Sequence, residues 1–262
     1  VADLGSAPLP LPIGIGVAAQ LWLESGIIAV APNLDWSDVP FLHLCQRRLQ
    51  RPIRLVNDLN AIVYAETLAG AARGARDVLC VYVGTGVGMG AVISGELFEG
   101  ADGLATELGH IKVGSPHSGR PCGCGQRGCL EAYVSGAHLA EIASERLRPD
   151  PSTLLLLAEK VDAAQLQQAL EQKDPLAEAI ISEAAHYLAQ GVSSAITLFN
   201  PRVLVFGGGV LEHAPALWQK TTALLGDYTP PSALHQLLIK PASLGDNAGV
   251  IGAALLAQRI ER

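Results

Sequence analysis

The 262-residue sequence contains few charged and few aromatic residues. Charged side chains make up 16% of the chain and aromatic ones 5%, whereas hydrophobic residues make up 49%. This composition fits a compact α/β protein far better than a disordered or coiled-coil protein. The 18 lysines and arginines are outnumbered by 25 aspartates and glutamates. The resulting net charge of −7 argues against a broad surface for nucleic acid.

Long apolar runs, internal repeats and a recognisable signal peptide are also missing. No apolar stretch approaches the roughly 20 residues that a membrane-spanning helix needs, and no period indicates a solenoid. The five cysteines are an odd number, and Cys45 and Cys80 lie in apolar surroundings. We therefore expect a cytoplasmic protein with reduced thiols that makes no membrane contact. Its length allows one large domain or two lobes.

Three of the cysteines are clustered in the order Cys122-x-Cys124-x4-Cys129. His110 lies upstream and would complete a tetrahedral zinc site with three thiolates and one imidazole. The alternatives are a disulfide or unliganded surface thiols, and His110 alone could be an ordinary polar residue. Clustered thiols in a reducing compartment are more often metal ligands, so the pattern predicts zinc. Because four protein ligands fill the coordination shell, such a zinc ion would be structural.

A glycine-rich run, Gly84-Thr85-Gly86-Val87-Gly88-Met89-Gly90, follows a predicted buried strand at residues 78–83. Part of it, Gly86-x-Gly88-x-x-Ala91, satisfies a loose dinucleotide fingerprint, but that fingerprint requires a helix directly after the glycines. Residues 91–97 instead predict a second strand with a turn. The glycines are therefore expected in a β-hairpin whose backbone N–H groups can approach a phosphate. A flexible hairpin without a ligand is the alternative.

Strands alternate with helices along much of the remaining chain, which predicts a layered α/β protein with a mixed sheet. A strand at residues 53–56 ends in Asn57-Asp58, and a helix is expected at residues 59–68 with one of these two residues as its N-cap. Polar residues between a strand and a helix are typical ligand-binding groups of α/β folds. The alternative is that Asp58 only caps the helix.

Other segments carry clear signals as well. Residues 31–36 predict a turn-rich loop and residues 39–49 a helix. A long helix is expected from Pro175 to Phe199, with Asp174 as its cap, because proline is favoured at the first helical position. A final helix is expected at residues 247–260, capped by Asp246.

The motifs together resemble one known family. They are Asn57-Asp58, the run Gly84–Gly90, Glu107-x-x-His110, the cysteine set ending in Leu130-Glu131, Gly207-Gly208-Gly209, and Gly245-Asp246-Asn247-Ala248-Gly249 followed by Gly252-Ala253-Ala254. From about Pro12 to the C-terminus, the chain resembles the ROK family of bacterial sugar kinases and sugar-responsive repressors, most closely its glucokinase branch. The resemblance implies an α/β, actin-like (ribonuclease-H-like) fold of two lobes with an inserted zinc-binding loop. Residues 1–73 would form a partial N-terminal lobe on which helix 247–262 packs, and residues 74–246 the C-terminal lobe.

The resemblance also implies roles for single residues. Asp58 would be the catalytic base, and Asn57, Glu107, His110 and Glu131 would bind the sugar hydroxyls. His110 would hold zinc with one ring nitrogen and face the sugar with the other. ATP with Mg²⁺ would be bound by Gly84, Thr85, Gly86 and Gly88 at the phosphates and by Gly207, Gly208 and Gly209 at the adenosine. A homodimer or a dimer of dimers is implied too.

Three features depart from the family pattern. The first phosphate hairpin, of Asp-x-Gly-Gly-Thr type, has no counterpart in these residues, so the chain looks like a kinase that lacks its N-terminal strands. The sequence Val17-Ala18-Ala19-Gln20 stands where Val-Pro-Gly-Pro is usual, and Thr106 stands where glycine is usual.

The function expected from the resemblance is ATP-dependent phosphorylation of a hexose, glucose above all, at its primary hydroxyl. The alternative is a non-catalytic sugar-sensing domain of a ROK-type repressor. No basic helix-turn-helix precedes Pro12, so we expect no DNA binding by this chain alone. A zinc-ribbon interaction module would leave Glu107, His110 and Glu131 unexplained.

Overall fold

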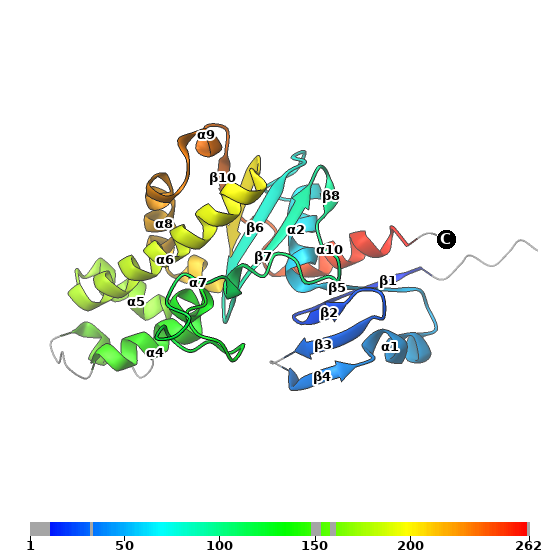
Figure 1. Cartoon of the computed structure of the whole chain (residues 1–262), viewed down its shortest axis with the longest axis horizontal. Helices are drawn as coiled ribbons and strands as arrows, with labels where there is room; N and C mark the ends of the chain where they lie inside the picture. Colours follow the sequence, from blue (N-terminus) through cyan, green and yellow to red (C-terminus); the bar gives the residue numbers. More distant parts are fainter. Residues whose placement is uncertain (1–10, 32–33, 148–152, 158–160, 261–262) are drawn as a thin grey trace, which may run out of the picture.

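The described residues form three sheets, which are flanked by helices. The computed structural model describes residues 11–31, 34–147, 153–157 and 161–260. Two parallel strands form the first sheet and three antiparallel strands the second, and the third is a five-stranded mixed sheet in the order β10-β9-β6-β7-β8 (Figure 1). The strands are β1 (Ile13–Val17), β2 (Gln20–Trp22), β3 (Ile27–Ala31), β4 (Trp36–Val39), β5 (Ile53–Asn57), β6 (Val78–Val83), β7 (Val87–Ile93), β8 (Glu96–Leu97), β9 (Val203–Gly207) and β10 (Leu238–Pro241).

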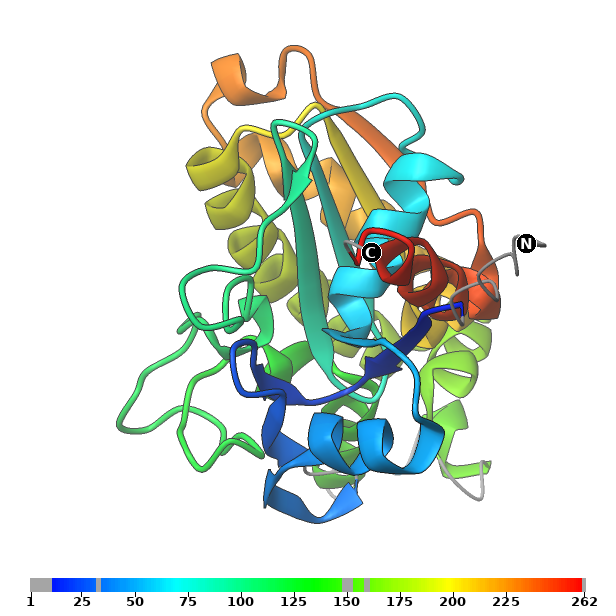
Figure 2. The same cartoon turned by 90° about the vertical axis from the view of Figure 1, so that its right-hand side faces the viewer.

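The helices divide between the sheets. Helices α1 (Phe41–Leu49) and α10 (Ala248–Ala257) lie with the two small sheets, and α2 (Asp58–Leu68) lies between α10 and strands β6 and β7 of the larger sheet (Figures 1 and 2). The others lie with the larger sheet: α3 (Glu131–Val134), α4 (Gly136–Leu147), α5 (Ala163–Glu171), α6 (Pro175–Phe199), α7 (Gly209–His213), α8 (Pro215–Tyr228) and α9 (Pro231–Leu234). None of the described helices is long and apolar enough to cross a membrane.

Strand β6 is buried on both faces, as its unbroken apolar sequence predicts. Leu79, Val81 and Val83 belong to the main core, which α6 also lines. Val78 and Cys80 point to the opposite face and pack with Val63 of α2. Because successive side chains of a strand point to opposite faces, a continuous apolar run allows helices to cover both sides.

Helices α2 and α10 pack closely although they are far apart in sequence. Helix α10 lies against α2 and β1 (Figures 1 and 2). Small residues permit this approach: a Cβ atom on Gly252 would lie 1.8 Å from the Ala61 carbonyl oxygen, and one on Gly14 would lie 1.9 Å from that of Ala253. Glycine at both positions is therefore a packing requirement.

Most of the predicted elements are confirmed, with local corrections. Helix α6 begins at Pro175, and Asp174 caps it by accepting the backbone N–H groups of Leu176 and Ala177. The predicted loop at residues 31–36 is wrong at both ends, since Ala31 ends strand β3 and Trp36 begins strand β4; Pro32 and Asn33 lie outside the described residues. Asp246 does not cap α10, because a short 3₁₀ turn at Gly245–Asn247 precedes that helix and no side chain caps it.

Candidate functional site

Asn57 and Asp58 lie at the junction of strand β5 and helix α2. The Asn57 Oδ1 atom accepts the backbone N–H groups of Leu59 at 2.9 Å and Asn60 at 3.2 Å, so Asn57 is the N-cap. Its amide nitrogen also donates to the Ala19 carbonyl oxygen at 3.2 Å. Asp58 is the first residue of the helix. The helix is therefore capped without the Asp58 side chain.

The Asp58 carboxyl lies in surroundings that favour its protonated form. Burial raises its pKa above the ordinary aspartate value, and the negative charge of Glu107 raises it further. Hydrogen bonds from backbone N–H groups at the helix start oppose part of this shift. A buried carboxyl with a raised pKa beside a second acidic group is a candidate proton acceptor, because such groups cluster at functional sites.

Glu107 precedes a single 3₁₀ turn, η2 (Leu108–His110), and His110 is the last residue of that turn. Their side chains approach at 3.9 Å between Glu107 Oε2 and His110 Nε2. Burial raises the pKa of Glu107, His110 lowers it, and the charge of Glu131 raises it again. Cys122 Sγ lies 3.8 Å from His110 Nδ1 and 3.6 Å from Glu131 Oε1, so Glu107, His110 and Glu131 surround one polar centre.

Two residues beside this polar centre, Gln20 and Thr106, have structural roles that the sequence patterns did not reveal. The Gln20 side chain lowers the pKa of Glu107, although the sequence marks Gln20 only as a departure from the family pattern. Thr106 adopts a left-handed conformation with φ of 68°. That region costs a residue with a side chain roughly 1–2 kcal/mol, which explains why glycine suits this position.

The Glu131 carboxylate connects the polar centre to the glycine-rich turn. Its Oε2 atom accepts the backbone N–H of Val87 at 3.0 Å. A Cβ atom on Gly86 would lie 2.5 Å from the same oxygen. Gly86 must therefore lack a side chain for Glu131 to reach the turn.

The two glycine-rich segments lie side by side. Strands β6 and β9 are parallel, with Tyr82 paired to Gly207, so residues 84–86 and 207–209 leave the sheet at the same edge. Gly208 has φ of 97°, and a Cβ atom there would lie 2.5 Å from the Val83 carbonyl oxygen. The predicted hairpin is confirmed, although Gly88 and Gly90 belong to strand β7 and only residues 84–86 form the turn. The carboxyl ends of parallel strands are where α/β sheets bind ligands.

The predicted metal ligands come together. One ligand atom from each of His110, Cys122, Cys124 and Cys129 lies within 4.8 Å of the others. Cys122 Sγ is 3.8 Å from His110 Nδ1, and Cys124 Sγ is 3.7 Å from Cys129 Sγ. A zinc tetrahedron with Zn–S bonds of about 2.3 Å has sulfur–sulfur edges of about 3.8 Å, so the donor set fits zinc in type and spacing. His110 turns Nδ1 toward the cysteines and Nε2 toward Glu107.

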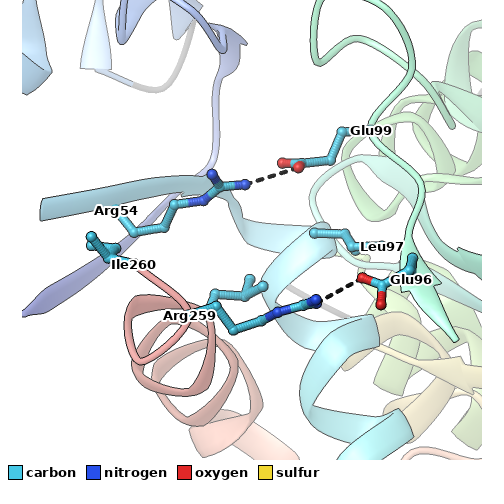
Figure 3. Close-up of a pocket in the computed structure, with 7 residues that line it drawn as sticks. Arg54, Glu96, Leu97, Glu99, Arg259 and Ile260 are labelled. Atoms are coloured by element: carbon cyan, nitrogen blue, oxygen red, sulfur yellow. Dashed lines mark hydrogen bonds and ion pairs between the residues drawn. The ribbon is translucent and has the colours of Figure 1, made fainter. Parts of the chain in front are cut away.

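A separate pocket of about 280 Å³ contains none of the predicted site residues. It lies between β5, the β8 region and the end of α10, and two ion pairs cross it (Figure 3). Arg54 binds Glu99 at 2.9 Å, and Arg259 binds Glu96 at 2.8 Å. Because each charge already has a partner, this pocket is better explained as a connection between elements than as the functional site.

Several known proteins are similar to this chain in both sequence and fold. Residues 9–260 match the ROK family model. A glucokinase from Thermotoga maritima is 35% identical over 266 residues, which cover 99% of this chain and 82% of the relative. A xylose repressor from Caldicellulosiruptor bescii is 29% identical and is matched over 92% of this chain and 61% of its own length.

A solved structure agrees with these relatives. The ROK family glucokinase from Streptomyces griseus, in complex with glucose and AMPPNP, superposes with a TM-score of 0.79. It is 32% identical, and the match covers 94% of this chain and 81% of that protein. Since the family match extends over nearly the whole sequence, the chain belongs to the ROK family.

Proposed function

We propose that this chain is an ATP-dependent sugar kinase that phosphorylates a hexose, glucose first of all, at its primary hydroxyl. One observation carries the proposal: Glu131 belongs to the polar centre around Glu107 and also binds the backbone of the glycine-rich turn. A sugar bound at the centre would thus lie beside a turn suited to phosphate. The similar glucokinases support the same assignment.

In this proposal Asp58 accepts the proton of the attacking sugar hydroxyl. Its position at the start of α2 and its raised pKa suit a base, since a stronger base accepts the proton more readily. Glu107, Glu131, His110 and the remaining amide N–H of Asn57 would bind the other hydroxyls and orient the sugar. Hydroxyls of a wrong stereoisomer would leave some of these groups unpaired.

ATP would bind along the edge of the sheet where β6 and β9 end. Backbone N–H groups of residues 84–88 would hold phosphate oxygens, and Gly207–Gly209 would contact the adenosine. Mg²⁺ would neutralise the triphosphate. We also infer an actin-like arrangement of two lobes, residues 1–73 with helix 247–262 and residues 74–246. The packing of α10 on α2 and β1 supports this division. A homodimer or dimer of dimers stays our expectation for the assembly.

The second candidate is a sugar-sensing domain without catalysis, which the similarity to a xylose repressor favours. A coupled assay for ADP release separates the two. We expect glucose-dependent ADP release from the kinase. Sugar binding without ADP release for any of several hexoses and pentoses would instead identify a sensor.

Replacing Glu131 by glutamine should weaken glucose binding about 5- to 150-fold. One charge-assisted hydrogen bond is worth on the order of 1–3 kcal/mol, and the amide keeps the shape of the side chain without its charge. Titration calorimetry without nucleotide measures the effect. Glu24→Gln, at an exposed carboxylate, is the matched control and should leave the affinity unchanged. Equal affinity of the wild type and Glu131→Gln would exclude Glu131 as a sugar ligand.

We further propose that the Cys₃His cluster holds one structural zinc ion per chain, which fixes the orientation of His110. Protein purified without chelator should contain near-stoichiometric zinc by elemental analysis. Cys124→Ser should lose most of the metal, because a hydroxyl is a poor replacement for a thiolate ligand. Cys45→Ser, at a free cysteine on α1, should retain it. Metal-free wild type, or equal zinc in both variants, would argue against the site.

A further inference from the structure

Lys112 lies beside the proposed zinc site but is not one of its ligands. It pairs with Cys129 across an isolated antiparallel bridge, which places the two side chains next to each other. The Lys112 Nζ atom donates to Cys129 Sγ at 2.9 Å. The lysine is exposed, whereas Cys129 is fully buried. The ammonium group therefore contacts the cluster from its solvent side.

The charges around the cluster make this contact significant. Zinc with three thiolates and a neutral imidazole carries a net charge of −1. Nearby carboxylates add to it, because Glu131 Oε1 lies 3.6 Å from Cys122 Sγ and Glu107 faces His110. A negative cluster with a buried sulfur is costly unless a cation or hydrogen-bond donor lies close by.

Two other cations of the same loop are directed elsewhere. Arg127 donates to the Gly119 carbonyl oxygen at 3.0 Å. Arg120 pairs with Glu145 and Glu141 on helix α4. Among the described lysines and arginines, Lys112 is the one that hydrogen-bonds to a ligand sulfur.

We propose that Lys112 is a positioning residue of the metal loop: it donates a hydrogen bond to the Cys129 thiolate, offsets the negative charge of the cluster and thereby raises the affinity for zinc. This inference rests on the proposed zinc site. Groups that hydrogen-bond to metal ligands orient them and tune the metal, and their loss typically costs 10- to 100-fold in affinity.

The test compares zinc affinities by competition with a chromophoric chelator. Lys112→Met keeps much of the aliphatic stem and removes the donor, so we expect affinity to fall about 10- to 100-fold. Lys112→Arg restores a charged donor and should stay close to wild type. Arg127→Met removes a cation from the same loop without touching a sulfur, and it should leave the affinity unchanged.

A spectroscopic measurement separates this role from a general effect on the fold. In the cobalt-substituted protein, Lys112→Met should shift the sulfur-to-metal charge-transfer band to longer wavelength, because a thiolate without its hydrogen bond gives up electron density more easily. Arg127→Met should not shift it. If Lys112→Met does not fold, Lys112→Ala, which also removes the donor to Cys129, provides the same two measurements.

The outcomes are distinct. Lower affinity with a shifted band in the Lys112 variant alone supports the inference. Zinc-bound wild type with unchanged affinity and spectrum in Lys112→Met overturns the role of Lys112 and leaves the zinc site intact. Equal losses in the Lys112 and Arg127 variants also overturn it, since they would reflect the charge of the loop. A wild type that binds no zinc removes the site itself, while the ADP assay still tests the kinase proposal.

Discussion

Asp58→Asn should lower sugar-dependent ADP release by roughly two to four orders of magnitude, the range expected when a positioned general base is lost. Asparagine keeps the shape of the side chain but cannot accept the proton. Glucose affinity should change little, because the neighbouring sugar contacts remain. Steady-state kinetics combined with calorimetry would show a fall in kcat at nearly constant sugar affinity.

The pH dependence should identify the same group. The base must be ionised, so the wild-type rate falls as pH drops through the folded-state pKa of Asp58. Burial raises that pKa above the ordinary aspartate value. We therefore expect the acidic limb of the kcat profile at a higher pH than an exposed aspartate would give, and we expect Asp58→Asn to abolish it.

The thermal stability of Asp58→Asn shows whether Asp58 acts as a base or only caps helix α2. A raised folded-state pKa means that ionised Asp58 opposes folding above that pKa and that its protonation favours folding. Asparagine carries no charge, and Asn57 already caps α2. Asp58→Asn should therefore unfold at the same temperature as wild type or at a slightly higher one. Asp102→Asn, which removes the charge of an exposed aspartate, is the control and should unfold at the wild-type temperature. Early unfolding with an unchanged rate per folded molecule would make Asp58 structural and would deprive the kinase proposal of its central residue.

Local signals explain which parts of the fold could be predicted from the sequence. Helix α6 has a capping aspartate, a proline at its first position and a long buried face, all within one segment. The cysteine motif is equally local, and the structure brings its four predicted ligands together. Such features depend on neighbours in the chain, so a pattern reveals them.

The features that the sequence did not reveal depend on distant partners. Strand β4 is short and only partly buried, and it exists because it pairs with β3. Gln20 of β2 lowers the pKa of Glu107, which is far away in the sequence. No periodicity or spacing encodes such a contact, because it arises only when the tertiary packing brings the partners together.

In the candidate functional site, too, contacts between distant residues were not predicted from the sequence. The motif around residues 84–90 predicted a glycine hairpin but not why Gly86 lacks a side chain. The answer is the carboxylate of Glu131, which is 44 residues away from its backbone partner Val87. Likewise, the sequence left the choice of N-cap between Asn57 and Asp58 open, and the hydrogen bonds decide for Asn57.

Gly252→Ala should destabilise the protein by about 3 kcal/mol or more. The new Cβ atom would lie 1.8 Å from the Ala61 carbonyl oxygen, and the obstacle is the backbone of α2. No side-chain rotation can relieve that contact, so α10 and α2 would have to move apart and lose buried contacts along both helices. The higher helix propensity of alanine, worth about 1 kcal/mol, opposes only part of this loss. In a chain of this size the midpoint of thermal unfolding should fall by roughly 6–12 °C.

Gly249→Ala, in the same helix, is the matched control. A Cβ atom there would meet only the Ile62 side chain, at 3.9 Å, which is ordinary van der Waals contact. Without a clash, the alanine should leave the stability equal or raise it by up to about 1 kcal/mol. Urea unfolding of the two variants thus isolates the helix contact from helix propensity, since both replace the same residue type in α10. Equal stabilities would mean that α10 and α2 can separate at no cost, and the close packing of these two helices would then not hold this part of the fold together.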